Sequence, residues 1–230
     1  MQKGLDLLLT KYSTPDKATF LEDGFVEIGG ESYPTLPWES ERRFIELRNL
    51  VINKRVGNMC TYRIGHTAHK GANLYKLLFR EIGILEFTVD SPVKEIFAIG
   101  GNNTLNCIAE TENGCVCTIE LGATLEAGEA EVDKHEIITD SGVACDRVVD
   151  TQVPQSSIYV YGKNCCVFCD TDAELYGYSE IEINTIRNAF LLASKKEARE
   201  VAADKYEHIA KVVAAASKSL ETLENVKVGG

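Results

Sequence analysis

The side chains best suited to chemistry in this sequence are its four histidines, His66, His69, His135 and His208. Imidazole can transfer a proton near pH 7 or bind a metal. His66 and His69 stand three residues apart in a predicted loop, residues 66–71, and loops often carry site residues. His135 begins a predicted strand, where a backbone or cross-strand partner is expected, and His208 falls on a predicted helix surface. No G-x-S-x-G nucleophile motif occurs in the chain.

A cysteine group offers a second kind of chemistry. Its members are Cys165, Cys166 and Cys169, followed by Asp170 and Asp172. Together they could hold zinc, and Cys115-x-Cys117 places two thiols on one strand face. A structural zinc site needs four ligands in paired positions, so this irregular group favours ordinary thiols and we expect no metal site. The sequence has eight cysteines, five of them in strand-like segments, where small core residues are expected.

Dinucleotide binding is not indicated by the glycines. The signature would be a strand, then G-x-G-x-x-G, then a helix, and it does not occur. The pairs Gly29-Gly30 and Gly100-Gly101 are typical of turns. We therefore expect no cofactor to be bound by this chain alone.

Composition narrows the class of partner. The chain has 230 residues, of which 44% are hydrophobic, enough for a sizeable core. Lys and Arg total 24 against 35 Asp and Glu, a net charge of −11, which disfavours nucleic acid and anionic membranes as partners. The run Leu7–Leu9 is too short for a signal peptide, and no apolar run is long enough to span a membrane. We expect a cytoplasmic protein with reduced cysteines.

The order of elements predicts the fold class. Two amphipathic helices are expected over Trp38–Asn53 and Asn73–Phe87, with a strand over Met59–Ile64 between them. A run of strands follows, and the chain is helical from Ser179 to about Leu223. This order predicts an α+β fold: a mostly antiparallel open sheet of about six strands, helices packed on one face, and a long C-terminal helix. Residues 164–178 are expected to be irregular, and the tail from Val226 is expected to fray.

One hairpin carries a register that can be derived. Apolar residues occupy the odd positions of Thr104–Thr111 and of Cys115–Leu121. A two-residue turn would pair odd with even positions, whereas a three-residue loop, residues 112–114, pairs Ala109 with Cys117 and Cys107 with Ile119. Only the second register keeps one face apolar. A second hairpin is expected from His135–Thr139 and Val143–Val149.

These elements, with their motifs, resemble the C-terminal domain of the Gfo/Idh/MocA oxidoreductase family. The resemblance rests on Arg43-Phe44 with Val56-Gly57-Asn58, on the helix around Gly83 with Ser91-Pro92-Val93 and the strand after it, and on the hairpin that ends at Leu121. It covers about residues 39–225. It implies three ranges: 1–37 as an N-terminal extension, 38–225 as the family-like domain, and 226–230 as a tail.

The resemblance also implies site residues. Family members carry an Asp-x-x-x-His pair that faces the nicotinamide, and an N-terminal Rossmann domain with an E-K-P lysine that binds NAD(P). Aligned through Gly83, the pair falls on Glu81 and Leu85. Leucine cannot transfer a proton, so another residue, such as His66 or His69, would have to supply the acid or base. Glu81 is the implied catalytic residue, with His66, His69 and Lys70 lining the substrate side.

Three hypotheses follow. The first, which we favour, is a stand-alone relative of that C-terminal domain. It would form a homodimer or larger assembly through its open sheet face, could bind a small polar metabolite, and would have no hydride-transfer activity alone. The second is one half of an NAD(P)-dependent sugar or polyol oxidoreductase, completed by a separate Rossmann-domain protein that supplies the cofactor. The third is a cysteine-based metal or redox module.

Overall fold

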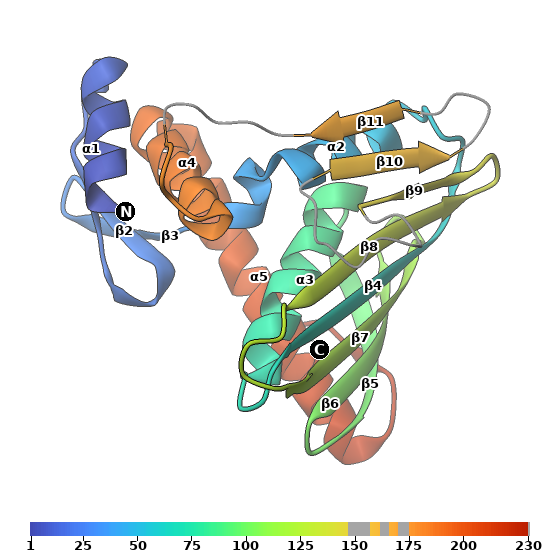
Figure 1. Ribbon diagram of the computed structural model, residues 1–230. Coiled ribbons are helices and arrows are strands. Elements are labelled where there is room, and N and C mark those ends of the chain that lie inside the picture. The colour runs from blue at the N-terminus through green and yellow to red at the C-terminus, as the bar shows by residue number, and fades with distance from the viewer. Residues whose placement is uncertain (147–156, 162–165, 170–174, 230) are drawn as a thin grey trace. The chain divides into compact units, whose positions relative to one another are not determined.

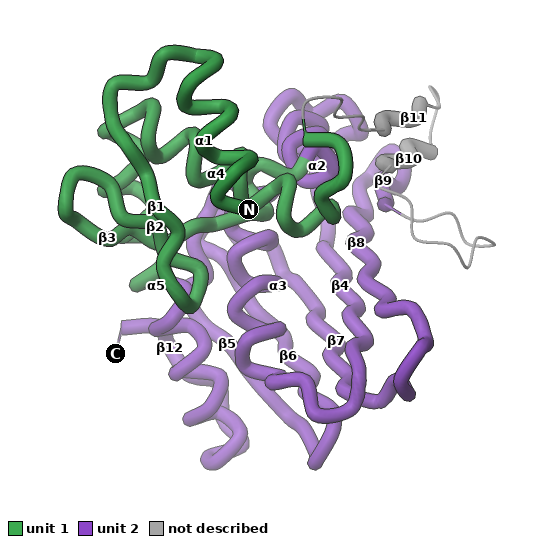
Figure 2. The backbone as a smooth tube through the Cα atoms, turned by 60° about the vertical axis from the view of Figure 1, so that its left-hand side comes forward, with its two compact units in different colours: residues 1–41, 171–208 green, residues 42–170, 209–230 purple. Residues whose placement is uncertain are grey.

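A computed structural model describes residues 1–146, 157–161, 166–169 and 175–229. The chain divides into two compact units, coloured separately in Figure 2. The first unit contains residues 1–41 and 171–208, and the second contains residues 42–170 and 209–230. Helices and strands occur in both units, so the predicted α+β class is confirmed.

The first unit combines helices with a small antiparallel sheet. Its elements are α1 (Gln2–Lys11), β1 (Ala18–Phe20), η1 (Glu22–Gly24), β2 (Phe25–Ile28), β3 (Glu31–Pro34), η2 (Pro37–Ser40), α4 (Glu180–Ser194) and the first part of α5 (Lys196–Thr222). Ser179 and Glu182 form a capping box that fixes the start of α4. The buried amide of Asn188 accepts a hydrogen bond from the backbone N of Leu36 at 2.9 Å, which joins α4 to the segment before η2.

The second unit is built on one large sheet with helices. Its helices are α2 (Arg42–Ile52), α3 (Leu74–Val89) and the remainder of α5. Its strands are β4 (Met59–His69), β5 (Val93–Gly101), β6 (Thr104–Thr111), β7 (Val116–Leu125), β8 (Val132–Thr139), β9 (Val143–Cys145), β10 (Ser157–Tyr161), β11 (Cys166–Cys169) and β12 (Val226–Lys227). Over the described residues their order is β11-β10-β9-β8-β4-β7-β6-β5-β12.

The sheet is mixed, which corrects the prediction of a mostly antiparallel sheet of about six strands. β4 and β7 are neighbours and run parallel, with Ile64 opposite Ile119. The cause is the crossover through α3, which carries the chain past two strand positions to β5 before the hairpins return it to β4 (Figure 1). Alternation in the sequence reports which residues share a face, but it does not report the direction of a neighbouring strand.

The predicted register of the β6–β7 hairpin is confirmed. Cys107 lies opposite Ile119 and Ala109 opposite Cys117. Thr111 N donates to Cys115 O at 3.0 Å, which closes the three-residue loop. Gly114 has a φ of +83°, the left-handed conformation that this loop requires.

Several local predictions are corrected. Residues 66–71 are not a loop up to His69, because β4 continues to that residue between β7 and β8. The predicted helix over Trp38–Asn53 is divided into η2 and α2. The segment 164–178 contains β11, and the tail forms β12, where Val226 pairs with Ile96 of β5. Of the cysteines expected in the core, Cys60 is exposed.

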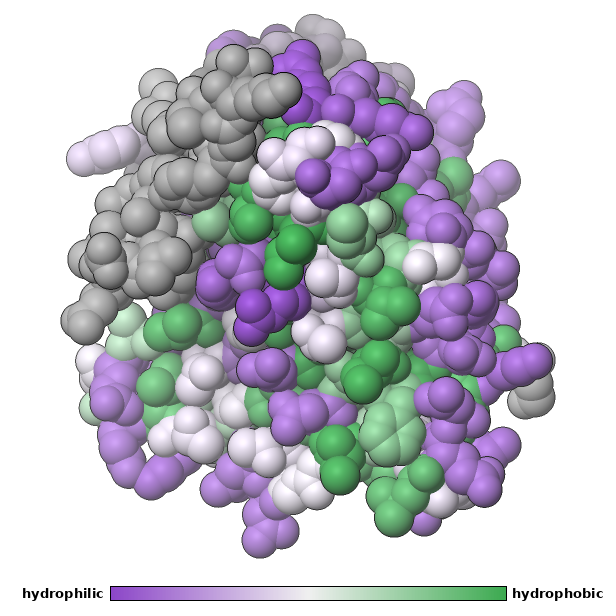
Figure 3. All heavy atoms as spheres, turned by 90° about the vertical axis from the view of Figure 1, so that its right-hand side faces the viewer, coloured by the Kyte–Doolittle hydropathy of each residue, from purple (hydrophilic) through white to green (hydrophobic). Residues whose placement is uncertain are grey.

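The two faces of the large sheet differ. On one face, α3 and the end of α5 pack against the strands (Figure 1), and Ser219 of α5 accepts a hydrogen bond from Ala98 N at 2.9 Å. Tyr62, Ile64 and His66 of β4 are buried on this side. On the other face, the side chains of Ile99 and Ile108 are about half exposed. Figure 3 views the molecule from this open side, where hydrophobic residues gather between hydrophilic ones. No helix in the described part of the chain could cross a membrane.

Candidate active site

Glu81, the predicted catalytic residue, lies inside the second unit on α3. The helix begins at the N-cap Asn73, whose side chain accepts hydrogen bonds from Tyr75 N and Lys76 N. Leu78, Ile82 and Leu85 share the buried face of α3 with Glu81, and all four side chains are fully buried. An amphipathic helix thus carries one carboxylate into the core, where it must find partners.

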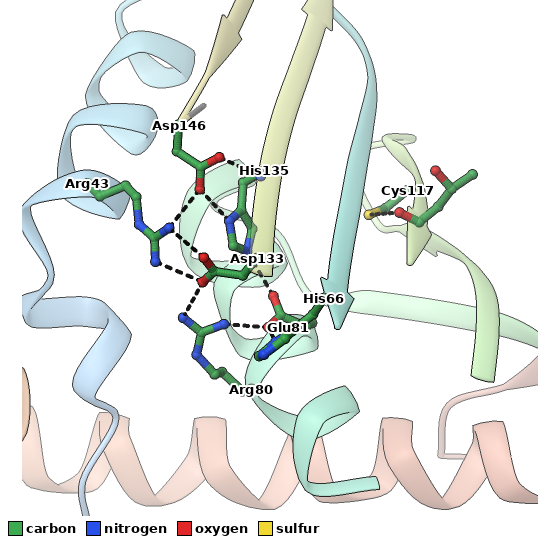
Figure 4. Close-up of polar contacts among 9 residues, drawn as sticks. Arg43, His66, Arg80, Glu81, Cys117, Asp133, His135 and Asp146 are labelled. Carbon is green, nitrogen blue, oxygen red and sulfur yellow. Dashed lines mark hydrogen bonds and ion pairs between the residues drawn. The ribbon is translucent and has the colours of Figure 1, made fainter. Parts of the chain in front are cut away.

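Two histidines meet that carboxylate. His66 Nδ1, on β4, is 2.7 Å from Glu81 Oε1, and His135 Nε2, on β8, is 2.8 Å from Glu81 Oε2. β4 and β8 are antiparallel neighbours in the sheet. Both rings are buried, His135 completely and His66 with 6% of its surface exposed. Two adjacent strands therefore present imidazoles to one carboxylate of the helix above them (Figure 4).

Further charged groups complete a cluster around this core. Asp146, which follows β9, accepts from His135 Nδ1 at 2.6 Å. Arg43 of α2 donates to Asp146 at 2.9 Å and to both oxygens of Asp133 at 3.0 Å. Arg80 of α3 donates to Glu81 and to Asp133. Figure 4 shows all of these side chains pointing toward one another, with Cys117 apart from them.

The electrostatics fix the charges in the cluster. Burial by itself would raise the pKa of Glu81, but the charge of Arg80 and the hydrogen bonds from His135 and His66 hold that pKa well below its usual value. Burial would lower the pKa of His135, but Asp146 and then Glu81 raise it to about 9. Burial would raise the pKa of Asp133, yet Arg43 holds it well below its usual range. At neutral pH Glu81 and Asp133 are therefore ionised and His135 is protonated, beside the guanidinium groups of Arg43 and Arg80.

His66 is the member of the cluster with one ring nitrogen bonded to Glu81 and the other not bonded within the cluster. Glu81 is ionised and can only accept a hydrogen bond, so the hydrogen on Nδ1 belongs to His66. Within the described residues, His66 Nε2 makes no hydrogen bond. A carboxylate that orients an imidazole through one nitrogen and leaves the other available is a recurring acid–base arrangement. The cluster can therefore position one histidine for proton transfer.

The other predicted site residues lie elsewhere. The ring of His69 contacts Glu131 at 3.1 Å and the backbone oxygen of Glu129 at 2.9 Å, and 41% of its side chain is exposed. Lys70 is exposed and pairs with Glu126. The structure thus brings Glu81 and His66 together and leaves His69 and Lys70 at the surface. Their roles in substrate binding stay predictions.

Sequence reasoning missed His135, Asp146 and Arg43 as members of the cluster. A cross-strand partner was expected for His135, and Asp146 across the β8–β9 hairpin is that partner. The contact of His135 with Glu81 was not expected, because their separation of 54 residues leaves no local signal. In the sequence, Arg43 belongs only to the family pattern. In the structure its guanidinium lies 4.5 Å from the ring of the adjacent Phe44, a contact that the sequence does not indicate.

In the described ranges, no group of three or more His, Cys, Asp or Glu side chains is arranged to hold a metal ion. The predicted Cys165 group lies outside the residues whose side chains are described. Cys107, Cys115 and Cys117 are buried, and burial raises their thiol pKa values, to about 12 for Cys107 and about 11 for Cys115. These three thiols are poor nucleophiles.

Two places in the second unit, the N-terminus of α3 and the pair Gly100-Gly101, do not offer the groups that would hold the dinucleotide bound by family members. A pyrophosphate would use the free amides at a helix N-terminus that follows a strand. At α3, which follows β4, those amides are already bonded to Asn73 Oδ1 at 2.9 and 3.2 Å. Gly100-Gly101 joins β5 to β6, so a strand and not a helix follows these glycines.

Comparisons with known proteins rest on structure alone. No protein-family model and no curated protein matches the sequence. An oxidoreductase from Agrobacterium radiobacter, solved with NAD+, L-tartaric acid and magnesium, is similar with a TM-score of 0.67 at 12% identity, over 86% of this chain and 65% of that one. Scyllo-inositol dehydrogenase from Lactobacillus casei gives 0.60 at 14% identity, over 85% and 64%.

A probable dehydrogenase from Thermotoga maritima gives a TM-score of 0.58 at 16% identity, over 84% of this chain and 64% of that one. This chain thus spans less than two thirds of the length of the structures it matches. At these identities the likeness concerns the fold. The resemblance drawn from the sequence is confirmed at that level: the chain has the fold of the corresponding part of Gfo/Idh/MocA-type dehydrogenases.

Proposed function

We propose that this chain is the substrate-side part of an oxidoreductase, with no hydride-transfer activity by itself. Glu81 and His66 would form its proton-transfer pair, and a separate Rossmann-domain protein would supply NAD(P). The observation that carries the proposal is the 2.7 Å contact between His66 Nδ1 and Glu81. It returns an imidazole to the carboxylate that aligns with the Asp of the family pair, although Leu85 stands at the position of the family histidine.

The chemistry of the pair fits the removal of a hydroxyl proton. Oxidation of an alcohol requires a base within hydrogen-bonding reach of the hydroxyl group. Glu81 is a poor base, because its interactions with Arg80 and His135 hold its pKa well below the usual value. His66 Nε2 is the nitrogen that remains available within the described residues. In this proposal His66 is therefore the base, and Glu81 orients it.

The small polar metabolite would be a polyol or a sugar-like molecule. Several structural neighbours support this class: one is levoglucosan dehydrogenase solved with levoglucosan, and another is scyllo-inositol dehydrogenase solved with scyllo-inositol. Both ligands carry several hydroxyl groups. The substrate is proposed by class, since the neighbours share only 11% and 14% identity with this chain.

We also propose that the open face of the large sheet pairs with a second copy of this chain. A shallow hollow on this face is lined by Phe97, Ile99, Ile108 and Thr118 among other residues. Beside it lie Arg63, Lys134, Glu120 and Glu136, two charges of each sign. A two-fold interface brings the same patch of both copies together, so apolar residues of the two copies would meet and positive charges of one copy could face negative charges of the other.

Reconstitution tests the enzymatic part of the proposal. The purified chain would be mixed with a candidate Rossmann-domain protein, NAD+ or NADP+, and scyllo-inositol or levoglucosan, and NAD(P)H formation followed by absorbance. Activity is expected only in the mixture, and His66→Gln should reduce kcat by about 100-fold or more. His208→Gln, at the end of the first unit's part of α5, is the matched control and should retain activity. Equal kcat for His66→Gln and the unsubstituted protein would refute the role of His66, and turnover by the chain alone would refute the need for a partner.

Light scattering tests the assembly. The monomer mass is 25.3 kDa, so a dimer should scatter as a particle of twice that mass at micromolar concentration. A monomer at every concentration tested would contradict self-association while leaving the enzymatic proposal open to its own test.

A further inference from the structure

The buried cluster contains a linear chain of hydrogen bonds through four side chains. Asp146 contacts His135 at 2.6 Å, His135 contacts Glu81 at 2.8 Å, and Glu81 contacts His66 at 2.7 Å. These residues come from the end of β9, β8, α3 and β4. Asp146, His135 and Glu81 have fully buried side chains, so water cannot replace any of these contacts.

We propose that Asp146 and His135 are positioning residues that act through Glu81 to fix the tautomer and orientation of His66. The proposal deepens the function proposed above and rests on the role of His66 as the base. It concerns residues beyond the Glu81–Leu85 pair that the family resemblance marks.

Counting donors and acceptors shows which atom donates in each of these hydrogen bonds. Asp146 accepts from His135 Nδ1 and, through its other oxygen, from the His135 backbone N at 2.8 Å. Both carboxylates beside His135 can only accept, so both of its ring nitrogens must donate and the ring is an imidazolium. Its Nε2–H then occupies Glu81 Oε2 and leaves Oε1 to receive the Nδ1–H of His66.

The unbonded ring nitrogen at the end of this series of hydrogen bonds distinguishes the series from a purely structural ion cluster. The ring nitrogens of His135 are both bonded within the protein. In contrast, His66 Nε2 makes no hydrogen bond within the described residues. The series of contacts therefore ends at one ring nitrogen, His66 Nε2, that has no hydrogen-bonding partner among the described residues.

The charged groups around the four hydrogen-bonded side chains stabilise this arrangement. Arg43 from α2 faces Asp146 and Asp133, and Arg80 from α3 faces Glu81 and Asp133. The Tyr62 hydroxyl of β4 and the Cys117 thiol of β7 feel the charge of Glu81, although neither makes a hydrogen bond to it within the described residues. Burial raises both of their pKa values, so both stay neutral. If His135 lost one proton, it could donate a hydrogen bond to only one of the two carboxylates, and its hydrogen bond to Glu81 or to Asp146 would be lost.

Nitrogen NMR on the full chain tests the inference without any substrate or partner. With only four histidines, the long-range ¹H–¹⁵N spectrum of histidine-labelled protein can be assigned by single substitutions. At pH 7.5 we expect His135 to be doubly protonated and His66, when neutral, to carry its hydrogen on Nδ1. On raising the pH, the step in which His135 loses its proton should shift the Nδ1 signal of His66. A His66 signal that is unaffected by that step overturns the proposal.

Substitutions give a second, independent readout. Asp146→Asn should release the proton of His135 at lower pH and leave His66 as a mixture of tautomers. Asp140→Asn, in the β8–β9 turn where Asp140 bonds Asn58, is the matched control and should leave both rings unchanged. A single unchanged tautomer in folded Asp146→Asn also overturns the proposal. If Asp146→Asn does not fold, the pH titration of the unsubstituted protein decides.

The two proposals fail separately. If the His66 Nδ1 signal does not respond when His135 loses its proton, and His66→Gln is inactive, the positioning role is refuted and the enzymatic role of His66 is kept. If the His66 Nδ1 signal does respond and His66→Gln is fully active, the positioning of His66 is kept and its role as the base is refuted.

Discussion

The protonated, fully buried His135 makes the stability of this protein depend on pH in a particular direction. Its pKa rises from an ordinary 6.5 to about 9 on folding. Between pH 6.5 and about pH 9, the folded protein therefore keeps a proton on His135 that the unfolded chain has released. The stabilisation is fully present below pH 6.5 and is lost as the pH rises through about 9.

The size of the effect follows from the two pKa values. A rise from 6.5 to about 9 corresponds to about 3 kcal/mol of stabilisation at low pH. Glu81 and Asp133 do not add to this slope, because folding lowers the pKa of both carboxyl groups and both are ionised in both states above pH 6. Between pH 6 and pH 8 the free energy of unfolding should fall by about 2 kcal/mol, which lowers Tm by about 4 to 8 °C for a chain of this size.

Urea unfolding followed by circular dichroism at pH 6, 7 and 8 measures this change. The upper limit of pH 8 matters, because buried Cys107, Cys115 and Cys117 begin to contribute above it, when thiols of the unfolded chain ionise. His135→Gln should be less stable and should lose most of the slope. His69→Gln, at an exposed position, should keep it. A free energy of unfolding that stays constant from pH 6 to pH 8 in the unsubstituted protein would refute this account of the cluster.

Further substitutions test other features of the structure. Arg43→Met leaves two carboxylates of the cluster without their shared cation and should cost about 3 to 5 kcal/mol in urea unfolding. Gly100→Ala would place a Cβ 2.6 Å from the backbone oxygen of Thr104 and should cost about 1 to 3 kcal/mol, whereas Gly101→Ala, whose nearest contact is 3.8 Å, should cost less than about 0.5 kcal/mol. Equal losses for the two glycines would contradict the geometry of the β5–β6 hairpin. Ile108→Lys, on the open sheet face, should abolish dimer formation in light scattering and change monomer stability by no more than about 0.5 kcal/mol.

In the proposed reaction, His66 of β4 takes the role that a histidine on the helix has in the family. The helix position that aligns with the family histidine holds Leu85, which is fully buried in the core. The imidazole instead comes from β4, a strand that α3 covers. A side chain from another element can reach the same carboxylate because a helix packed on a sheet presents its buried face to several strands at once.

Local features of the fold were determined by the sequence itself. The alternation of apolar residues in β6 and β7 determines their register, because a shift of one residue would place every apolar side chain on the opposite face. The helical spacing of Leu78, Ile82 and Leu85 likewise determines which face of α3 is buried. The fold class and the resemblance to Gfo/Idh/MocA-type dehydrogenases could be inferred from such patterns, since they depend on the order of elements.

Only the tertiary structure decided the direction of β7 beside β4 and the composition of the buried cluster. A crossover through α3 makes these two strands parallel, and alternation is the same for either direction. His66 was expected in a loop, yet it is a strand residue beneath Glu81, and His135 reaches the same carboxylate from 54 residues away. Contacts between elements far apart in sequence leave no periodic pattern. The partners of a buried charge are therefore known only when the elements that carry them are packed together.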